Sequence, residues 1–164
     1  MIISDSSPLI HLTRLGKITF LLNVTGQITI SRSVYEEVVT EGKKKNYMES
    51  YIIENLVNEG KIVVKTLKPF DMSNYPPLGR GELESLELAR QMGDNVMLDE
   101  KKARNVARIM GLNAQTTIAT IFEMLIVKAL GKQEYSNNIK RLGESGWISA
   151  DIIQEYLERG EKHG

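Results

Sequence analysis

The chain contains no cysteine, and only two of its 164 residues are histidines, His11 and His163. The absence of cysteine excludes disulfides, thiolate nucleophiles and cysteine-ligated zinc or iron–sulfur clusters. Two histidines cannot build a multi-histidine metal site within one chain. Any bound metal must therefore be held by oxygen ligands, and these ligands favour Mg²⁺ or Mn²⁺.

An excess of charge of one sign is also lacking, as are long apolar runs. The chain has 21 basic and 21 acidic residues, so a contact with nucleic acid must come from a local basic patch. No apolar run approaches the ~20 residues that span a bilayer, and the N-terminus lacks a basic-then-apolar signal sequence. We therefore expect a cytoplasmic protein with no membrane partner.

Short strand-like runs alternate with longer helical stretches in the first two thirds of the chain. The strand-like runs are 1–4, 27–31, 61–65 and 95–99, with 112–116 as a further candidate, and the helical stretches are about 7–24, 32–59, 81–92 and 100–110. This alternation predicts an α/β fold, in which a mostly parallel sheet of four to five short strands is covered by helices on both faces.

Local signals place several boundaries. Ser7 before Pro8 is typical of a helix N-cap followed by a first-turn proline, and Gly93 and Gly111 are typical of helix ends. Segment 68–81 holds three of the four prolines and predicts a loop. Beyond residue 117 the pattern is helical only. We expect residues 1–164 to form one domain, with about 117–160 as a helical C-terminal extension, because that part is too small for a core of its own.

Two aspartates follow strand-like runs. Asp5 comes after the first run and Asp99 after the fourth. Ligands of open parallel sheets bind beyond the carboxyl ends of the strands, where both residues are expected. Aspartate is also a common helix N-cap, so for a single such residue capping is the simpler interpretation. For two at equivalent strand ends, capping and ligand binding are about equally supported.

A third acid, Glu82, begins the helical segment 81–92 on its apolar side. At ~100° per residue it shares a side with Leu83 and Leu86, whereas Glu84 falls opposite. Three interpretations explain its position: the carboxylate favours the helix dipole, it lies at a rim position that is not truly buried, or it points into a cleft at the strand ends. We expect Glu84, Glu87 and Glu100 to be solvated.

A fourth acid is expected in "SRSVYEEVV", at residues 31–39. Val34, Tyr35, Val38 and Val39 define the buried face, and Glu36 and Glu37 lie about equally far from it, so periodicity does not choose between them. Four carboxylates in one cleft repel each other unless cations neutralise them. Divalent ions held by oxygen ligands do so and can activate water at a phosphodiester, which indicates metal-assisted hydrolysis without a covalent intermediate.

The chain resembles the PIN-domain nucleases over essentially its whole length. The motifs that carry the resemblance are "IISDSSPLIHLTRLG", "ITISRSVYEEVV", "GRGELESLELARQMG" and "VMLDEKKARNVARIMGL", which follow one another in the family's order. More narrowly, it is similar to a PIN-like branch of short prokaryotic proteins long catalogued without an assigned function, and to VapC-like toxins. The resemblance implies a three-layer α/β/α sandwich around a parallel sheet, with additional C-terminal helices.

The same resemblance implies a Mg²⁺- or Mn²⁺-dependent ribonuclease whose ligands are Asp5, Glu37, Glu82 and Asp99. It prefers Glu37 over Glu36 by its spacing from Ser31, and it leaves Glu100 as a substitute for Asp99. Ser6 matches a small hydroxyl residue that supports the first aspartate. Many PIN proteins of this size are toxins that dimerise and are silenced by a small antitoxin protein, so RNA, an antitoxin and a second copy are the expected partners.

Basic residues near these acids are candidates for substrate binding. Lys101, Arg104 and Arg108 share one helix face, and Arg80 lies near Glu82. An ordinary solvated face is the simpler interpretation of the first three, and a stripe that follows RNA phosphates is the functional one. The main alternative to a nuclease is a catalytically weak or inactive PIN-like scaffold that binds RNA or protein.

Overall fold

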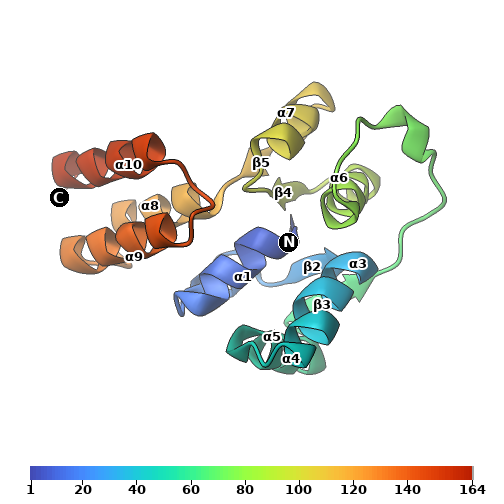
Figure 1. The fold of residues 1–164 in the computed structure, drawn as a ribbon, viewed down its shortest axis with the longest axis horizontal. Helices are drawn as coiled ribbons and strands as arrows, with labels where there is room; N and C mark the ends of the chain where they lie inside the picture. Colours follow the sequence, from blue (N-terminus) through green and yellow to red (C-terminus); the bar gives the residue numbers. More distant parts are fainter. Residues whose placement is uncertain (164) are drawn as a thin grey trace. The chain divides into compact units, whose positions relative to one another are not determined.

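Five short strands form one parallel sheet in the computed structural model, which describes residues 1–163 (Figure 1). The strands are β1 (Ile2–Ser4), β2 (Ile28–Ser31), β3 (Ile62–Lys65), β4 (Asn95–Met97) and β5 (Ala114–Gln115), in the order β3-β2-β1-β4-β5. Each neighbouring pair is parallel. The α/β class, the parallel sheet and the number of strands expected from the sequence are therefore confirmed.

Helices connect the strands and cover the sheet. In chain order they are α1 (Ser6–Arg14), α2 (Ile18–Thr25), α3 (Arg32–Tyr35), the π-helix η1 (Glu36–Glu41), α4 (Gly42–Lys44), α5 (Met48–Asn58), the 3₁₀ turn η2 (Met72–Asn74), α6 (Arg80–Met92) and α7 (Lys101–Ile109). Figure 1 shows α6 and α7 on one side of the sheet and α1 and α5 on the other. This is the three-layer arrangement expected for the fold.

The core lies on both faces of the sheet because every central strand is apolar. Ile3 and Val96 from adjacent strands are fully buried against Leu86 of α6 and Ala107 of α7. Strands buried on both sides read as continuous apolar runs, which is why β1, β2 and β4 could be located from the sequence. At ~25 cal/mol per Å² of apolar surface, this burial is the main term that holds the layers together.

The strand order reverses direction at the centre of the sheet. β1 is followed in the chain by its neighbour β2 and then by β3 on the same side, whereas β4 pairs with the opposite side of β1 and continues to β5. The connecting helices therefore diverge to opposite faces beyond the carboxyl ends of β1 and β4. In open α/β sheets this switch point is where ligands bind.

The first helix begins earlier than the sequence indicated. α1 starts at Ser6, and Asp5 occupies the N-cap position with extended backbone (φ −75°, ψ 172°) but makes no side-chain capping bond. The prediction of Ser7 as the N-cap is therefore wrong, because Ser7 and Pro8 both lie inside the first turn. Gly93 ends α6 with φ 69° in the left-handed region, as predicted.

Residues Met1–Gln115 form one compact unit that contains the sheet, and a second unit begins at Thr116. The second unit consists of α8 (Thr117–Ile126), α9 (Lys132–Glu144) and α10 (Ala150–His163), so the helical pattern expected there is confirmed. That the whole chain forms a single domain stays a prediction. Within residues 1–163, no helix is long and apolar enough to span a membrane.

The second unit is organised around Tyr135 of α9, which is 1% exposed. Its hydroxyl donates a hydrogen bond to the carbonyl oxygen of Tyr156 in α10, at 2.6 Å. Phe122 of α8 contacts the Tyr135 ring at 6.1 Å between centroids. Gly160 lies directly against this ring: a Cβ there would be 2.3 Å from its Cε1 atom. Only a glycine fits at this point of contact between α9 and α10.

We expect the substitution Gly160→Ala to lower the free energy of unfolding by about 1–3 kcal/mol, because the added methyl group forces Tyr135 from its packed position. Gly131→Ala is the matched control, since a Cβ at that N-cap position meets nothing within 4 Å. Urea unfolding monitored by circular dichroism measures both. Equal losses in the two variants would contradict the packing role of Gly160.

Candidate functional site

Asp5 stands at the carboxyl edge of the sheet, at the switch point between β1 and β4. Its backbone N–H donates a hydrogen bond to the carbonyl oxygen of Met97 at 3.1 Å, which extends the β1–β4 pairing by one residue. The residue is only 6% exposed. A buried carboxylate here does not act as a helix cap, so its position calls for another explanation.

Glu37 is the acid from the second connection that lies beside Asp5. It belongs to the π-helix η1, a rare form that occurs frequently at functional sites. Ser6 Oγ donates a hydrogen bond to Glu37 Oε2 at 2.7 Å. A Cβ on Gly81 would be 3.1 Å from Asp5 Oδ1 and 3.4 Å from Glu37 Oε2, so both oxygens surround this glycine at the start of α6.

The open choice between two neighbouring glutamates is therefore resolved in space. The Glu36 side chain is exposed and pairs with Arg32 at 3.3 Å, whereas Glu37 Oε2 lies with Asp5 Oδ1 around Gly81. The resemblance expected Ser6 to support the first aspartate, but its hydroxyl binds Glu37. The catalytic role of Glu37 and of the other three acids stays a prediction.

Asp99 is held by two side chains of α1. Ser7 Oγ donates to Asp99 Oδ2 at 3.3 Å, and His11 Nδ1 lies 3.2 Å from the same oxygen. His11 is 4% exposed, and it was not among the residues predicted for the site. The only signal was spacing, because Ser7 and His11 are four residues apart and share one helix face. Glu100, the substitute considered for Asp99, is exposed and precedes α7.

Glu82 lies in the first turn of α6 and is half-buried. Its Oε2 atom accepts a hydrogen bond from the backbone N–H of Gly79 at 3.0 Å, which is a capping contact. Its negative charge nevertheless acts on Asp5. Glu82 therefore combines the helix-start role with a place in the acidic group.

The charges of the three other candidate acids act on Asp5. Burial raises the pKa of Asp5 from 3.8 to about 7, and the charges of Glu82, Glu37 and Asp99 add to this rise against a lowering hydrogen bond from the Ser6 backbone. Each of the three other candidates thus acts on the Asp5 carboxylate. Like charges in a buried site favour the protonated form, so ionisation of Asp5 at neutral pH opposes folding.

A divalent cation would relieve this repulsion. Within residues 1–163, no three His, Asp or Glu side chains are already gathered as a metal-binding group. The chemistry of the candidate donors fits Mg²⁺ or Mn²⁺, because all four are carboxylates and these ions prefer oxygen ligands. Asp5, Glu37, Glu82 and Asp99 are the residues that would hold the ion.

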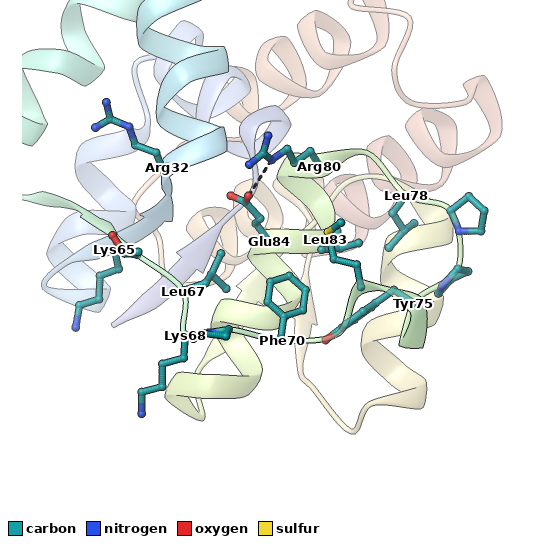
Figure 2. Close-up of a pocket in the computed structure, with 15 residues that line it drawn as sticks. Arg32, Lys65, Leu67, Lys68, Phe70, Tyr75, Leu78, Arg80, Leu83 and Glu84 are labelled. Carbon is teal, nitrogen blue, oxygen red and sulfur yellow. Dashed lines mark hydrogen bonds and ion pairs between the residues drawn. The ribbon is translucent and has the colours of Figure 1, made fainter.

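Two further acids of α6 are buried, which contradicts the expectation that they are solvated. Glu84 is 8% exposed, accepts a hydrogen bond from the Ser33 backbone N–H at 3.2 Å and pairs with Arg80 at 3.1 Å (Figure 2). Burial raises the pKa of Glu84, but these hydrogen bonds outweigh it and lower the pKa below its usual value. Periodicity failed here because α3 packs on what would otherwise be the outer face of α6.

Glu87 is 1% exposed and also lies among cationic and polar partners. Hydrogen bonds from Arg90, with smaller contributions from Tyr75 and Gln91, lower its pKa to about 2. Glu84 and Glu87 are therefore ionised acids paired within the chain. They differ in kind from Asp5, on which the acting charges are negative.

The four predicted substrate-binding cations are placed differently from one another. Lys101 and Arg108 are exposed, as either interpretation of that helix face expected. Arg104 donates a hydrogen bond to the backbone carbonyl of Asp99, so part of its function is to hold that residue. The Arg80 side chain is 82% exposed although it pairs with Glu84. Their contact with substrate stays a prediction.

Comparison with known proteins assigns this architecture to a family. A family model described as a PIN domain matches residues 1–162, nearly the whole chain. No curated protein matches the chain at a significant level. The family match covers the sheet, the four acids and the helices that follow them.

The raised pKa of Asp5 predicts a pH-dependent stability when divalent metal is removed. Because the folded-state pKa of about 7 exceeds the unfolded value of 3.8, the protonated acid stabilises the fold at low pH, and this stabilisation is lost as pH rises through 7. We expect EDTA-treated protein to melt at a higher temperature at pH 6 than at pH 8. Only about one pH unit of this interval lies below the folded-state pKa, so the expected loss of stability between pH 6 and pH 8 is about 1.4 kcal/mol.

Asp5→Asn should remove much of this pH dependence and raise the melting temperature at pH 8 by several degrees. Glu36→Gln, at an exposed glutamate next to Glu37, is the matched control and should melt like the original protein. Differential scanning calorimetry in EDTA compares the three. A variant Asp5→Asn that melts at or below the original protein at pH 8 would contradict the proposed repulsion.

Proposed function

The chain belongs to the PIN domain family, and we propose that it is a ribonuclease that hydrolyses RNA phosphodiesters with the aid of Mg²⁺ or Mn²⁺. PIN domains are generally nucleases and typically depend on divalent metal, which supports a nuclease-type fold at the coarser level. RNA as substrate, the metal and an endonucleolytic mode are the finer parts of the proposal.

One observation carries the proposal. A buried aspartate at the switch point of a parallel sheet is acted on by the charges of three other acids, which arrive from α6, η1 and the end of β4. A protein gains nothing in stability from this arrangement, because each carboxylate raises the cost of ionising the next. The same arrangement is useful if a cation binds there, since it then supplies negative oxygen ligands at the place where α/β proteins bind substrates.

When bound, a divalent ion supplies Lewis-acid stabilisation of charge at the phosphate and lowers the pKa of water. The residues of the chain orient the ligands. Ser6 holds Glu37 through its 2.7 Å hydrogen bond, and Ser7 and His11 hold Oδ2 of Asp99. Gly81 leaves the space between Asp5 and Glu37 open, because a side chain there would contact both oxygens.

The partners follow from the family rather than from the geometry. We propose RNA as substrate, a homodimer as the assembly, and a small antitoxin protein as the inhibitor that covers the acids, as in toxins of this family. A catalytically weak or inactive scaffold remains the second candidate. The arrangement of the acids does not favour this scaffold, because a protein that only binds RNA or another protein does not require four grouped carboxylates.

Purified protein incubated with a mixed RNA pool should cleave it in Mg²⁺ or Mn²⁺ and not in EDTA. Asp5→Asn and Asp99→Asn should each lower the rate by at least about 100-fold, because each removes a negative ligand from the group that binds the cation. Glu37→Gln should also lower the rate. Gel electrophoresis of end-labelled RNA measures the rates.

Glu36→Gln is the matched control for Glu37→Gln, since the two glutamates are adjacent and both exposed. Its rate should equal that of the original protein. Cleavage that persists in Asp5→Asn and Asp99→Asn would assign the activity to a contaminant or another site. Absence of cleavage together with retained RNA binding would support the scaffold.

A further inference from the structure

A cavity of about 950 Å³ lies between the carboxyl end of β3, the loop 66–79 and the first turn of α6 (Figure 2). Its lining includes the basic residues Arg32, Lys65, Lys68 and Arg80. None of the four candidate metal ligands belongs to it. The two sites are nevertheless adjacent, because Arg80 borders the cavity and a Cβ on the next residue, Gly81, would be 3.1 Å from Asp5 Oδ1 and 3.4 Å from Glu37 Oε2.

The loop that forms one wall is tied to α6 at two points. The Gln91 side chain donates to the carbonyl oxygen of Lys68 at 3.1 Å and accepts from its N–H at 2.9 Å. Farther along the loop, the Tyr75 hydroxyl donates to Glu87, whose charge is also paired with Arg90. These contacts hold the cavity open before any ligand arrives, and a preformed site loses less entropy on binding.

The floor of the cavity is apolar and partly aromatic. Phe70 and Tyr75 are half-buried and pack edge to face, with ring centroids 6.1 Å apart and planes at 89°. Leu67, Leu78 and Leu83 complete this surface. A half-buried aromatic pair offers a face on which a flat ring can stack, and each stacked base contributes about 1–3 kcal/mol in single-strand binding proteins.

The rim carries an excess of positive charge. Four basic residues line the cavity with a single acid, Glu84, which is already paired with Arg80 and Ser33. Lys65 and Lys68 are exposed and form no ion pair within residues 1–163. Figure 2 shows both side chains extending in the same direction, away from the apolar floor. Their amines are therefore available to an anion that passes the cavity mouth.

We propose that this cavity binds a nucleotide of single-stranded RNA next to the phosphate that is cleaved, with its base on Phe70 and Tyr75 and its backbone along Lys65 and Lys68. An aromatic floor with a cationic rim matches a flat base joined to phosphates. Bases in a duplex are stacked and paired, so they cannot enter. The proposal rests on the proposed nuclease function, to which it adds a specificity site.

The test measures RNA binding in EDTA, where cleavage does not interfere. Fluorescence anisotropy of a short labelled single strand should show Phe70→Ala weakening binding by about 5- to 100-fold, whereas Phe70→Tyr keeps the ring and the affinity. The affinity for a duplex of the same sequence should be equal for Phe70→Ala and the original protein. A general loss of folding in Phe70→Ala would instead weaken the binding of both the single strand and the duplex.

Two lysines at opposite ends of β3 provide a matched pair. Lys65 borders the cavity at the carboxyl end, and Lys61 precedes the strand at the other end. Lys65→Ala should reduce the slope of log affinity against log salt by about 0.7, the value for one phosphate contact on a single strand. Lys61→Ala should leave the slope unchanged.

Equal salt slopes in the two lysine variants, or an unchanged single-strand affinity in Phe70→Ala, would overturn the proposal. So would failure of the original protein to bind any single strand at low salt. Competition by an acidic peptide as strong as that by RNA would show that the rim collects anions in general, and would also overturn it. If Asp5→Asn abolishes cleavage while the cavity variants bind normally, only the cavity proposal fails. The opposite outcome is that the cavity variants lose RNA binding but the original protein shows no metal-dependent cleavage. That outcome would count against the nuclease function alone.

Discussion

The pairing of β1 with β4 is the constraint on which the rest of the acidic group depends. The hydrogen bond from the Asp5 N–H to the Met97 carbonyl brings Asp5 and Asp99 to one edge. Because α1 starts at the next residue, Ser6, Ser7 and His11 face the same edge and bind Glu37 and Asp99. A break in this pairing would separate the aspartates and also the side chains that orient their partners.

The acids of the chain fall into two groups that differ in how their charge is balanced. Glu84 and Glu87 are buried but surrounded by arginines and hydrogen-bond donors, and their pKa values are lowered. Burial raises the pKa of Asp5, and the negative charges of other acids add to this rise where Glu84 and Glu87 have cationic partners. Paired buried acids organise structure, whereas an unbalanced group at a strand end calls for a cation from outside.

The paired acids also shape the surface around the unbalanced ones. Glu87 holds Tyr75, and Glu84 connects the start of α3 to Arg80. The loop predicted for 68–81 from its prolines is confirmed as far as Gly79, apart from the short turn η2, whereas Arg80 and Gly81 already belong to α6. The loop is attached to α6 at Lys68 and Tyr75. Its position as the wall of a cavity depends on Glu87 and Gln91, about two and three turns into α6, and Glu87 was expected to be solvated.

The alternation of apolar runs and helical stretches determined the α/β class, the parallel sheet and most element positions, because these depend on local periodicity and on strands buried on both faces. Asp5 and Asp99 were placed by the same logic, since an acid after a buried strand must stand at the sheet edge. Periodicity left Glu36 and Glu37 open, the resemblance preferred Glu37, and the tertiary structure places Glu37 beside Asp5. Only the tertiary structure decided that His11 contacts Asp99 and that Glu84 and Glu87 are buried. Each of these depends on what packs against a helix face from a distant part of the chain, and periodicity within one helix does not contain that information.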